Sequence, residues 1–301
     1  MNGFIRFLLF SNCFYGLCVL GLSVEASMQL HIPLNSGWYY LFVFIATVLY
    51  YTHAYIGEQD TDTQNERAHW YRRHKRSVTY SQAALTVLFL LLGLQLLRDH
   101  FRELSQMNRW FWILGGIFPV IALLYYGSTR PLRLPYNLRS NGWLKPFFIG
   151  LVWAGAVTIY PVLFSGLAHG SPYEPEWLTA LLFIKNFMFI TMLCIMFDIK
   201  DYAADHNRQL KTFVVRYGLR KTIFFILIPL SVIGLGTFLI YAFLMHFPAA
   251  RILMNTIPFI LLIIVAYSMH RRKSILYYLA IIDGLMLVKA VCGITGMLLI
   301  K

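Results

Sequence analysis

The chain has 301 residues, of which 58% are hydrophobic and only 13% are charged. A soluble domain usually carries about 25% charged residues, so this composition excludes an ordinary soluble fold. The formal net charge is +13, from 26 Lys and Arg against 13 Asp and Glu. In a soluble protein such a charge would suggest nucleic-acid binding. Here the positions of the cations fit a membrane protein, and we expect no nucleic-acid partner.

Nine apolar segments approach the length of about 20 residues that a transmembrane helix needs. In chain order they cover residues 4–24, 37–56, 79–97, 110–127, 146–168, 178–197, 221–246, 252–269 and 275–300. The connections between them are short or moderate and leave no room for a separate soluble domain. The sequence therefore predicts an all-α, polytopic membrane protein with about nine transmembrane helices, organised as one domain over residues 1–301.

The cations orient these helices in the membrane. A cytoplasmic N-terminus places 19 of the 26 Lys and Arg on the inner side and five on the outer side, with Lys185 and Lys289 inside spans. Inner loops of membrane proteins carry the excess of positive charge, so we predict a cytoplasmic N-terminus and an outer C-terminus. A compact chain without a targeting extension fits the cytoplasmic membrane of a bacterium.

Three aspartates follow the sixth predicted span. Asp198, Asp201 and Asp205 are spaced i, i+3 and i+7, which places them on one stripe of a helix. Like charges on one stripe destabilise a helix, so the pattern predicts a bound cation. Clustered carboxylates without Cys or His suit a hard cation such as Mg²⁺, which commonly bridges carboxylates to substrate phosphates.

A second acidic pair, Glu58 and Asp62, follows the second predicted span and shares a helix face at i, i+4. Both acidic clusters are predicted at the cytoplasmic face, where together they could hold two Mg²⁺ ions around a diphosphate. Five basic residues are placed to neutralise the remaining phosphate charge: Arg130, Arg133, Lys200, Arg208 and Lys211. Each of them could equally be an ordinary cation of an inner loop.

Residues 197–218, FDIKDYAADHNRQLKTFVVRYG, resemble the second signature of the UbiA superfamily of intramembrane prenyltransferases. Tyr126 and Arg130 form a Tyr-x-x-x-Arg that is similar to the Tyr-x-x-x-Lys of that family. The first signature departs from the family pattern, because Ala54 stands where Asn is expected and Glu58 where Asp is expected. The positions of the second signature that match the family are Asp198, Asp201, Asp205, Arg208, Lys211, Thr212, Arg216 and Gly218.

The resemblance implies a helical bundle around a central cavity with an active site that faces the cytoplasm. It also implies Mg²⁺-dependent transfer of a prenyl group from a polyprenyl diphosphate to a lipophilic, often aromatic, acceptor, as in lipid or quinone biosynthesis. The implied catalytic residues are Asp198, Asp201, Asp205 and Tyr126. The implied metal ligands are Glu58, Asp62, Asp198, Asp201 and Asp205, and the implied diphosphate-binding residues are Arg130, Arg208 and Lys211.

Three other functions remain open. A catalytically silent relative that binds an isoprenoid or acts as a scaffold would explain Ala54. A CDP-alcohol phosphotransferase also begins its motif with Asp-x-x-Asp, but the Asp-Gly and Ala-Arg that it requires do not follow Asp201. A transporter fits less well, because the acids cluster at one membrane face.

Two ionisable residues inside the ninth span are functional candidates by their position. Asp283 lies nearer the cytoplasmic end and could reach the cavity, whereas Lys289 either snorkels or pairs with another helix. Lys185, in the sixth span, is expected to pack or snorkel.

Overall fold

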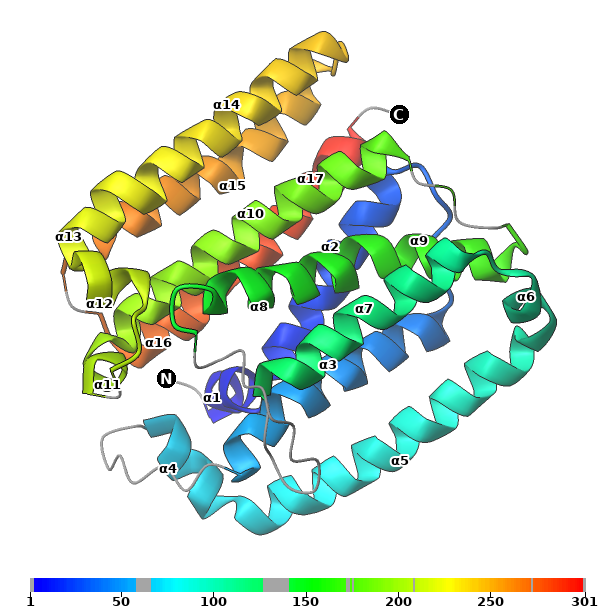
Figure 1. The fold of residues 1–301 in the computed structure, drawn as a ribbon, viewed down its shortest axis with the longest axis horizontal. Helices are drawn as coiled ribbons and strands as arrows, with labels where there is room; N and C mark the ends of the chain where they lie inside the picture. The colour runs from blue at the N-terminus through cyan, green and yellow to red at the C-terminus, as the bar shows by residue number, and fades with distance from the viewer. Residues whose placement is uncertain are drawn as a thin grey trace.

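The computed structural model describes residues 3–57, 66–126, 141–171, 174, 176–207, 209–271 and 273–299, without the side chains of Ala54, Ile56, Gly57, Tyr126 and Ala204. All regular secondary structure in these ranges is helical, and the long helices lie side by side in one bundle (Figure 1). The first half of the chain forms α1 (Gly3–Phe10), α2 (Cys13–Gln29), α3 (Gly37–Gly57), α4 (Glu66–Arg73), α5 (Lys75–Asp99), α6 (Phe101–Gln106), α7 (Arg109–Tyr126), α8 (Lys145–Ala154) and α9 (Tyr160–Ala168). The second half forms α10 (Trp177–Lys200), α11 (Tyr202–Asn207), α12 (Phe213–Tyr217), α13 (Leu219–Lys221), α14 (Ile228–Leu244), α15 (Ala249–Ser268), α16 (Ile275–Tyr277) and α17 (Gly284–Leu298).

Short π-helical turns at Gly155–Ile159, Thr222–Leu227 and Tyr278–Ile282 join α8 to α9, α13 to α14 and α16 to α17. Each of the nine segments predicted to span the membrane therefore contains helix in the described part of the chain. Within the described ranges six of these helical segments are long and apolar enough to cross a membrane, or seven if α1 and α2 count as one span. The all-α membrane fold is confirmed, and the count of nine remains a prediction.

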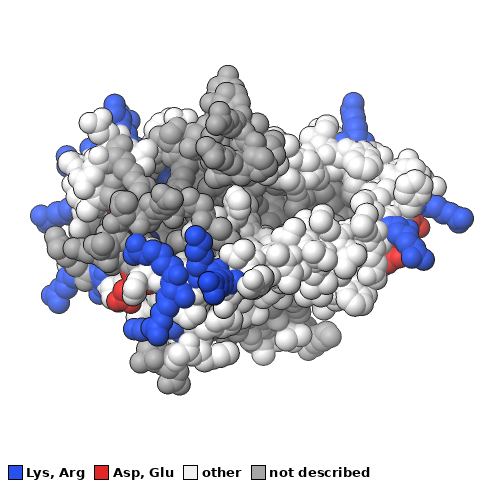
Figure 2. Space-filling view, turned by 90° about the horizontal axis from the view of Figure 1, so that it is seen from below, with Lys and Arg blue, Asp and Glu red and all other residues white. Residues whose placement is uncertain are grey.

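The outer surface of the bundle has the character of a lipid-facing surface. On α5, Leu90, Leu91 and Leu94 each expose more than half of their surface, at 57%, 58% and 64%. Figure 2 shows basic side chains gathered toward the two ends of one face, with an uncharged stretch between them. A soluble protein rarely exposes so large an apolar surface, whereas a hydrocarbon core requires one.

The first predicted span, 4–24, is wrong in its limits. The chain turns at Asn12, whose φ is 65°, and α1 meets α2 at a bend of 69°. The Asn12 amide donates hydrogen bonds to Thr52 Oγ1 at 2.9 Å and to the Tyr71 hydroxyl at 3.0 Å. The Tyr71 hydroxyl donates to the Phe10 carbonyl at 2.8 Å. Burial raises the pKa of Tyr71 above its ordinary value, so this hydroxyl keeps its proton and remains a donor.

One small apolar cluster ties the helices together at the end of the bundle where α10 finishes. Leu9, Phe10 and Leu279 form its buried centre, and Trp70 and Phe197 pack against them. The cluster therefore joins α1, α4, the last turns of α10 and the π-helical turn before α17. The described chain after the first acidic segment, which begins with α4, therefore lies at the same end of the bundle as the last turns of α10.

Candidate functional site

Two of the three predicted aspartates converge on one lysine. Lys145 Nζ lies 2.7 Å from Asp198 Oδ1 and 3.9 Å from Asp205 Oδ2. Asp198 and Asp205 are buried, with 1% and 5% of their surfaces exposed, and the Lys145 side chain is 15% exposed. Asp198 Oδ2 is buried and makes no hydrogen bond within the described part of the chain. Two buried carboxylates thus share one ammonium group, and one of their oxygens is left for a further cation.

Asp201 points elsewhere, because the helix does not continue regularly through it. The last residue of α10 is Lys200, Asp201 has a non-helical ψ of 5°, and α11 starts at Tyr202. The Asp201 carboxylate lies 3.1 Å from Lys200 Nζ, and 40% of its side chain is exposed. Among the described residues, no three His, Cys, Asp or Glu side chains converge as metal ligands would. The structure therefore brings Asp198 and Asp205 together and leaves Asp201 at the rim.

The segment after α11 approaches the start of α8. A Cβ atom on Gly142 would lie 2.8 Å from the Lys211 carbonyl carbon and 2.8 Å from the Thr212 nitrogen, so only glycine fits between these backbones. Thr212 then caps α12, with its Oγ1 accepting a hydrogen bond from the Val215 N–H at 3.4 Å. The predicted phosphate-binding Lys211 is therefore held next to the turn that leads into Lys145.

Several predicted site residues lie outside the described residues. These are Glu58, Asp62, Arg130 and Arg208. Tyr126 is the last residue of α7, and its side chain is not among those that the structure describes. The preceding residue, Tyr125, is buried and lines the cavity described next.

A cavity of about 490 Å³ lies between α3, α7 and the helix formed by α8 and α9. Five aromatic residues border it toward the end at which α8 begins: Tyr50, Tyr51, Tyr125, Phe148 and Trp153. Trp153 donates a hydrogen bond to the Tyr51 hydroxyl. The other end is bordered by apolar groups and by the backbone of one glycine: Phe42, Phe111, Gly115, Leu163 and Phe164. The walls are thus almost entirely apolar, as in a site for a hydrocarbon chain.

One helical segment connects the carboxylates to the cavity. Lys145 is the first residue of α8, and the cavity-lining residues begin one turn later at Phe148 and continue to Phe164. With a rise of about 1.5 Å per residue, these sixteen steps extend over about 24 Å. The carboxylates therefore lie near one end of a cavity whose lining extends over a length comparable to most of the hydrocarbon thickness.

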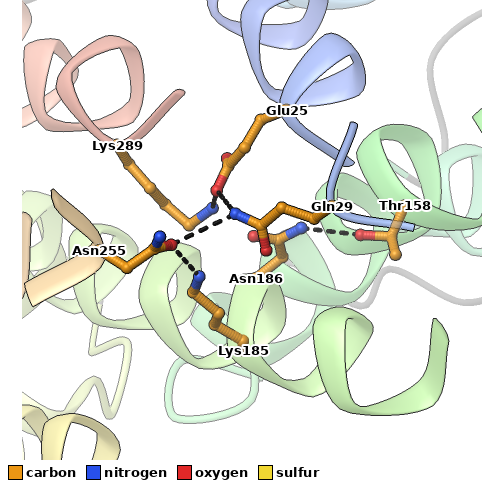
Figure 3. A network of polar contacts seen from close by, with 7 residues as sticks. All are labelled: Glu25, Gln29, Thr158, Lys185, Asn186, Asn255 and Lys289. Carbon is orange, nitrogen blue, oxygen red and sulfur yellow. Dashed lines mark hydrogen bonds and ion pairs between the residues drawn. The ribbon is translucent and has the colours of Figure 1, made fainter. Parts of the chain in front are cut away.

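A second polar cluster lies deeper in the bundle (Figure 3). Lys289 Nζ on α17 contacts both carboxylate oxygens of Glu25 on α2, at 2.9 and 2.7 Å. Gln29 donates to Glu25 at 2.9 Å and to Asn255 at 3.2 Å, and Lys185 donates to the same Asn255 oxygen at 2.7 Å. Lys289 thus pairs with another helix, and the Lys185 ammonium group is held inside the bundle.

This cluster is separate from the carboxylates at the end of α10. Lys185 and Asp198 lie on the same helix, and their separation along it is about 20 Å. Asp283 is buried, but it is not among the residues that line the cavity.

Sequence reasoning did not single out Lys145 as a site residue, because cations at the inner ends of spans are common. It also missed the Tyr51–Trp153 pair, since neither spacing nor charge distinguishes an aromatic cavity wall from a packed helix face. Glu25 was not predicted as an intramembrane residue, because the predicted first span ends at residue 24. One signal could have revealed Glu25. It directly follows an apolar segment, and an intramembrane lysine such as Lys289 needs an acidic partner.

Comparison with known proteins assigns the family. The model of the UbiA prenyltransferase family matches residues 16–282, which covers most of the chain. No match was found among curated proteins or among solved structures. The matched region includes the cavity, Lys145 and all three aspartates. With its apolar helices and buried carboxylates, the chain is an integral membrane protein that belongs to the UbiA prenyltransferase family.

Proposed function

We propose that this protein transfers a prenyl group from a polyprenyl diphosphate to a lipophilic, aromatic acceptor inside the membrane, in a reaction that requires Mg²⁺. The observation that carries the proposal is that two buried carboxylates lie near one end of a long apolar cavity, joined to it by α8. Members of the family act on polyprenyl diphosphates and lipophilic acceptors in the membrane. The two ends of such a substrate, one highly charged and one hydrocarbon, match the two parts of the site.

The carboxylates fit a divalent cation. Asp198 and Asp205 already share the Lys145 ammonium group, and Asp198 Oδ2 is a buried acceptor without a hydrogen-bond partner among the described residues. When bound there, Mg²⁺ would neutralise the diphosphate and favour its departure. We keep Asp201, Glu58 and Asp62 in the proposed ligand set, with Arg130, Arg208 and Lys211 as phosphate-binding residues. Tyr126 keeps its proposed catalytic role.

The residues of the chain would then direct the transfer. The bond that breaks joins the first carbon of the prenyl group to the diphosphate oxygen, and the electron pair leaves with the diphosphate. The acceptor forms the new carbon bond and releases a proton. Tyr51, Tyr125 and Trp153 border this end of the cavity, and their rings can stabilise the allylic cation by about 0.5–2 kcal/mol per contact. The apolar walls exclude the water that would otherwise capture it.

The location follows from the charge asymmetry of the chain. We propose that residues 1–301 form one UbiA-like domain in a bacterial cytoplasmic membrane, with the carboxylate site facing the cytoplasm. The proposed prenyl transfer would serve lipid or quinone biosynthesis.

Turnover by the purified protein tests this function. We expect lipid-nanodisc samples to release diphosphate from geranyl, farnesyl or a longer prenyl diphosphate when Mg²⁺ and a suitable acceptor from a panel of quinone precursors are present. A chelator should abolish the release. Binding of a prenyl diphosphate without any release would instead favour the catalytically silent relative, and the absence of binding would contradict both.

The length of the accepted prenyl chain should depend on Gly115. Gly115 lines the far end of the cavity, and a Cβ atom there would meet nothing within 4 Å, so a side chain can grow into the open space. We expect Gly115→Phe to lower kcat/KM for long relative to short prenyl diphosphates by at least about 10-fold. The matched control is Gly116→Phe, because Gly116 also has nothing within 4 Å but does not line the cavity. An equal effect of both variants would contradict a prenyl chain in this cavity.

A further inference from the structure

Lys145 is the residue of the site whose role the family assignment leaves open. It is mostly buried, begins α8 and reaches Asp198 at 2.7 Å and Asp205 at 3.9 Å. The following inference rests on the proposed function, because it concerns how Mg²⁺ and the diphosphate enter this same site.

Lys145 holds the two carboxylates of this group through one ammonium group in a mostly buried setting. The Asp198 Oδ2 atom is buried and accepts no hydrogen bond within the described part of the chain, so it would attract a cation. A divalent ion placed between the same carboxylates would, however, lie within a few ångströms of the lysine. Two like charges at such a distance repel strongly when little water separates them.

The repulsion is relieved if Lys145 can leave the carboxylates for another anion. A lysine carries a compact charge on a flexible four-carbon stem, so its ammonium group can move while its backbone stays in place. The backbone before it is fixed, because Gly142 packs against the backbone of Lys211 and Thr212. The diphosphate would bring the nearest new negative charge, since it must contact the same Mg²⁺.

We propose that Lys145 is a diphosphate-binding residue that neutralises Asp198 and Asp205 until substrate arrives. When Mg²⁺ and the diphosphate bind, the ammonium group moves from the carboxylates to the phosphate oxygens. Mg²⁺ alone then binds weakly, because it must displace Lys145 without giving it another partner. The two ligands strengthen each other, and linkage requires this coupling to be the same in both directions. Lys145 thus keeps the buried carboxylates paired in the free protein, and Mg²⁺ binds tightly only when the diphosphate is also bound.

Metal binding measured without turnover tests the proposal. Mn²⁺ can replace Mg²⁺ in the full-length protein, and electron paramagnetic resonance reports the free ion with and without inorganic pyrophosphate. In the unmodified protein we expect pyrophosphate to tighten Mn²⁺ binding by about 10-fold or more. In Lys145→Met we expect Mn²⁺ alone to bind about 10-fold more tightly than in the unmodified protein, and the pyrophosphate effect to shrink.

Two further variants make the result decisive. Lys75 also begins a membrane-spanning helix but is exposed, so Lys75→Met should behave as the unmodified protein does. Lys145→Arg keeps the charge and should keep weak binding of Mn²⁺ alone. Unchanged or weaker Mn²⁺ binding in Lys145→Met would overturn the role of Lys145, as would tight binding in Lys145→Arg. If no protein binds Mn²⁺ even with pyrophosphate, the proposed metal-dependent function fails as well.

Discussion

Lys289→Met is expected to destabilise the fold by about 3–5 kcal/mol, because it leaves the buried Glu25 carboxylate without its cation. The Lys289 and Glu25 side chains are 3% and 1% exposed, so water cannot replace the lost partner. The contact is also tight: a Cβ atom on Gly293 would lie 2.5 Å from Glu25, and only glycine leaves room for the carboxylate against α17. The loss is measurable as a lower midpoint of denaturant unfolding in detergent.

The double variant Glu25→Leu with Lys289→Met provides the control. Replacing both charges by apolar groups of similar size removes the unpaired carboxylate, so most of the lost stability should return. The double variant should therefore lose much less stability than the sum of the two single losses, which is a large coupling free energy in the double-mutant cycle. Additive losses of the two single variants would show that the ion pair does not hold α2 against α17.

Asp205→Asn and Asp198→Asn are each expected to lower the rate of prenyl transfer by about 100-fold or more. Loss of a group that hydrogen-bonds to a metal ligand costs about 10–100-fold in activity, and loss of the ligand itself should cost more. The amide keeps the size of the side chain but removes the negative charge that would hold Mg²⁺. Steady-state release of diphosphate at saturating Mg²⁺ measures the effect.

Asp99→Asn serves as the matched control, because Asp99 ends α5 and is exposed. It should retain full activity. If Asp198→Asn and Asp205→Asn were as active as Asp99→Asn, the carboxylates would not be the catalytic metal ligands. A parallel loss of thermal stability would be recognised by comparing the unfolding midpoints of all three variants.

Sequence patterns predicted the helices well because each one must bury about 20 apolar residues in lipid, and that requirement is local. The predicted ranges 79–97 and 178–197 lie wholly within α5 and α10. The break at Asn12 was missed because it depends on distant partners, Thr52 on α3 and Tyr71 on α4. The hydrophobicity of residues 4–24 carries no information about those contacts.

The candidate site was predictable only in part for the same reason. The spacing of Asp198 and Asp205 indicated a shared face, and they do share Lys145. The spacing also placed Asp201 on that face, but the turn at Asp201 redirects its side chain to Lys200. Lys145 itself comes from a helix 53 residues earlier in the chain. Its pairing depends on how α8 packs against α10, which charge and periodicity do not specify.

The cavity could not be predicted from the sequence at all. Its walls combine residues of α2, α3, α5, α7, α8, α9 and the π-helical turn between α8 and α9. The aromatic content of 17% was compatible with such a cavity and equally with packed helices and interfacial belts. Only the assembled bundle distinguishes Tyr51 and Trp153, which border open space, from Phe189, which is fully buried in the core.

Photolabelling with a prenyl diphosphate that carries a diazirine near its tail tests the central claim most directly. If the diphosphate binds at Asp198 and Asp205 while the chain enters the cavity, mass spectrometry should find the label on lining residues of α7 and α9. Labelling should require Mg²⁺, decrease with inorganic pyrophosphate and be lost in Asp205→Asn. Labelling of the exposed outer faces of α5 or α14, or labelling that is independent of Mg²⁺ and of Asp205, would contradict the account.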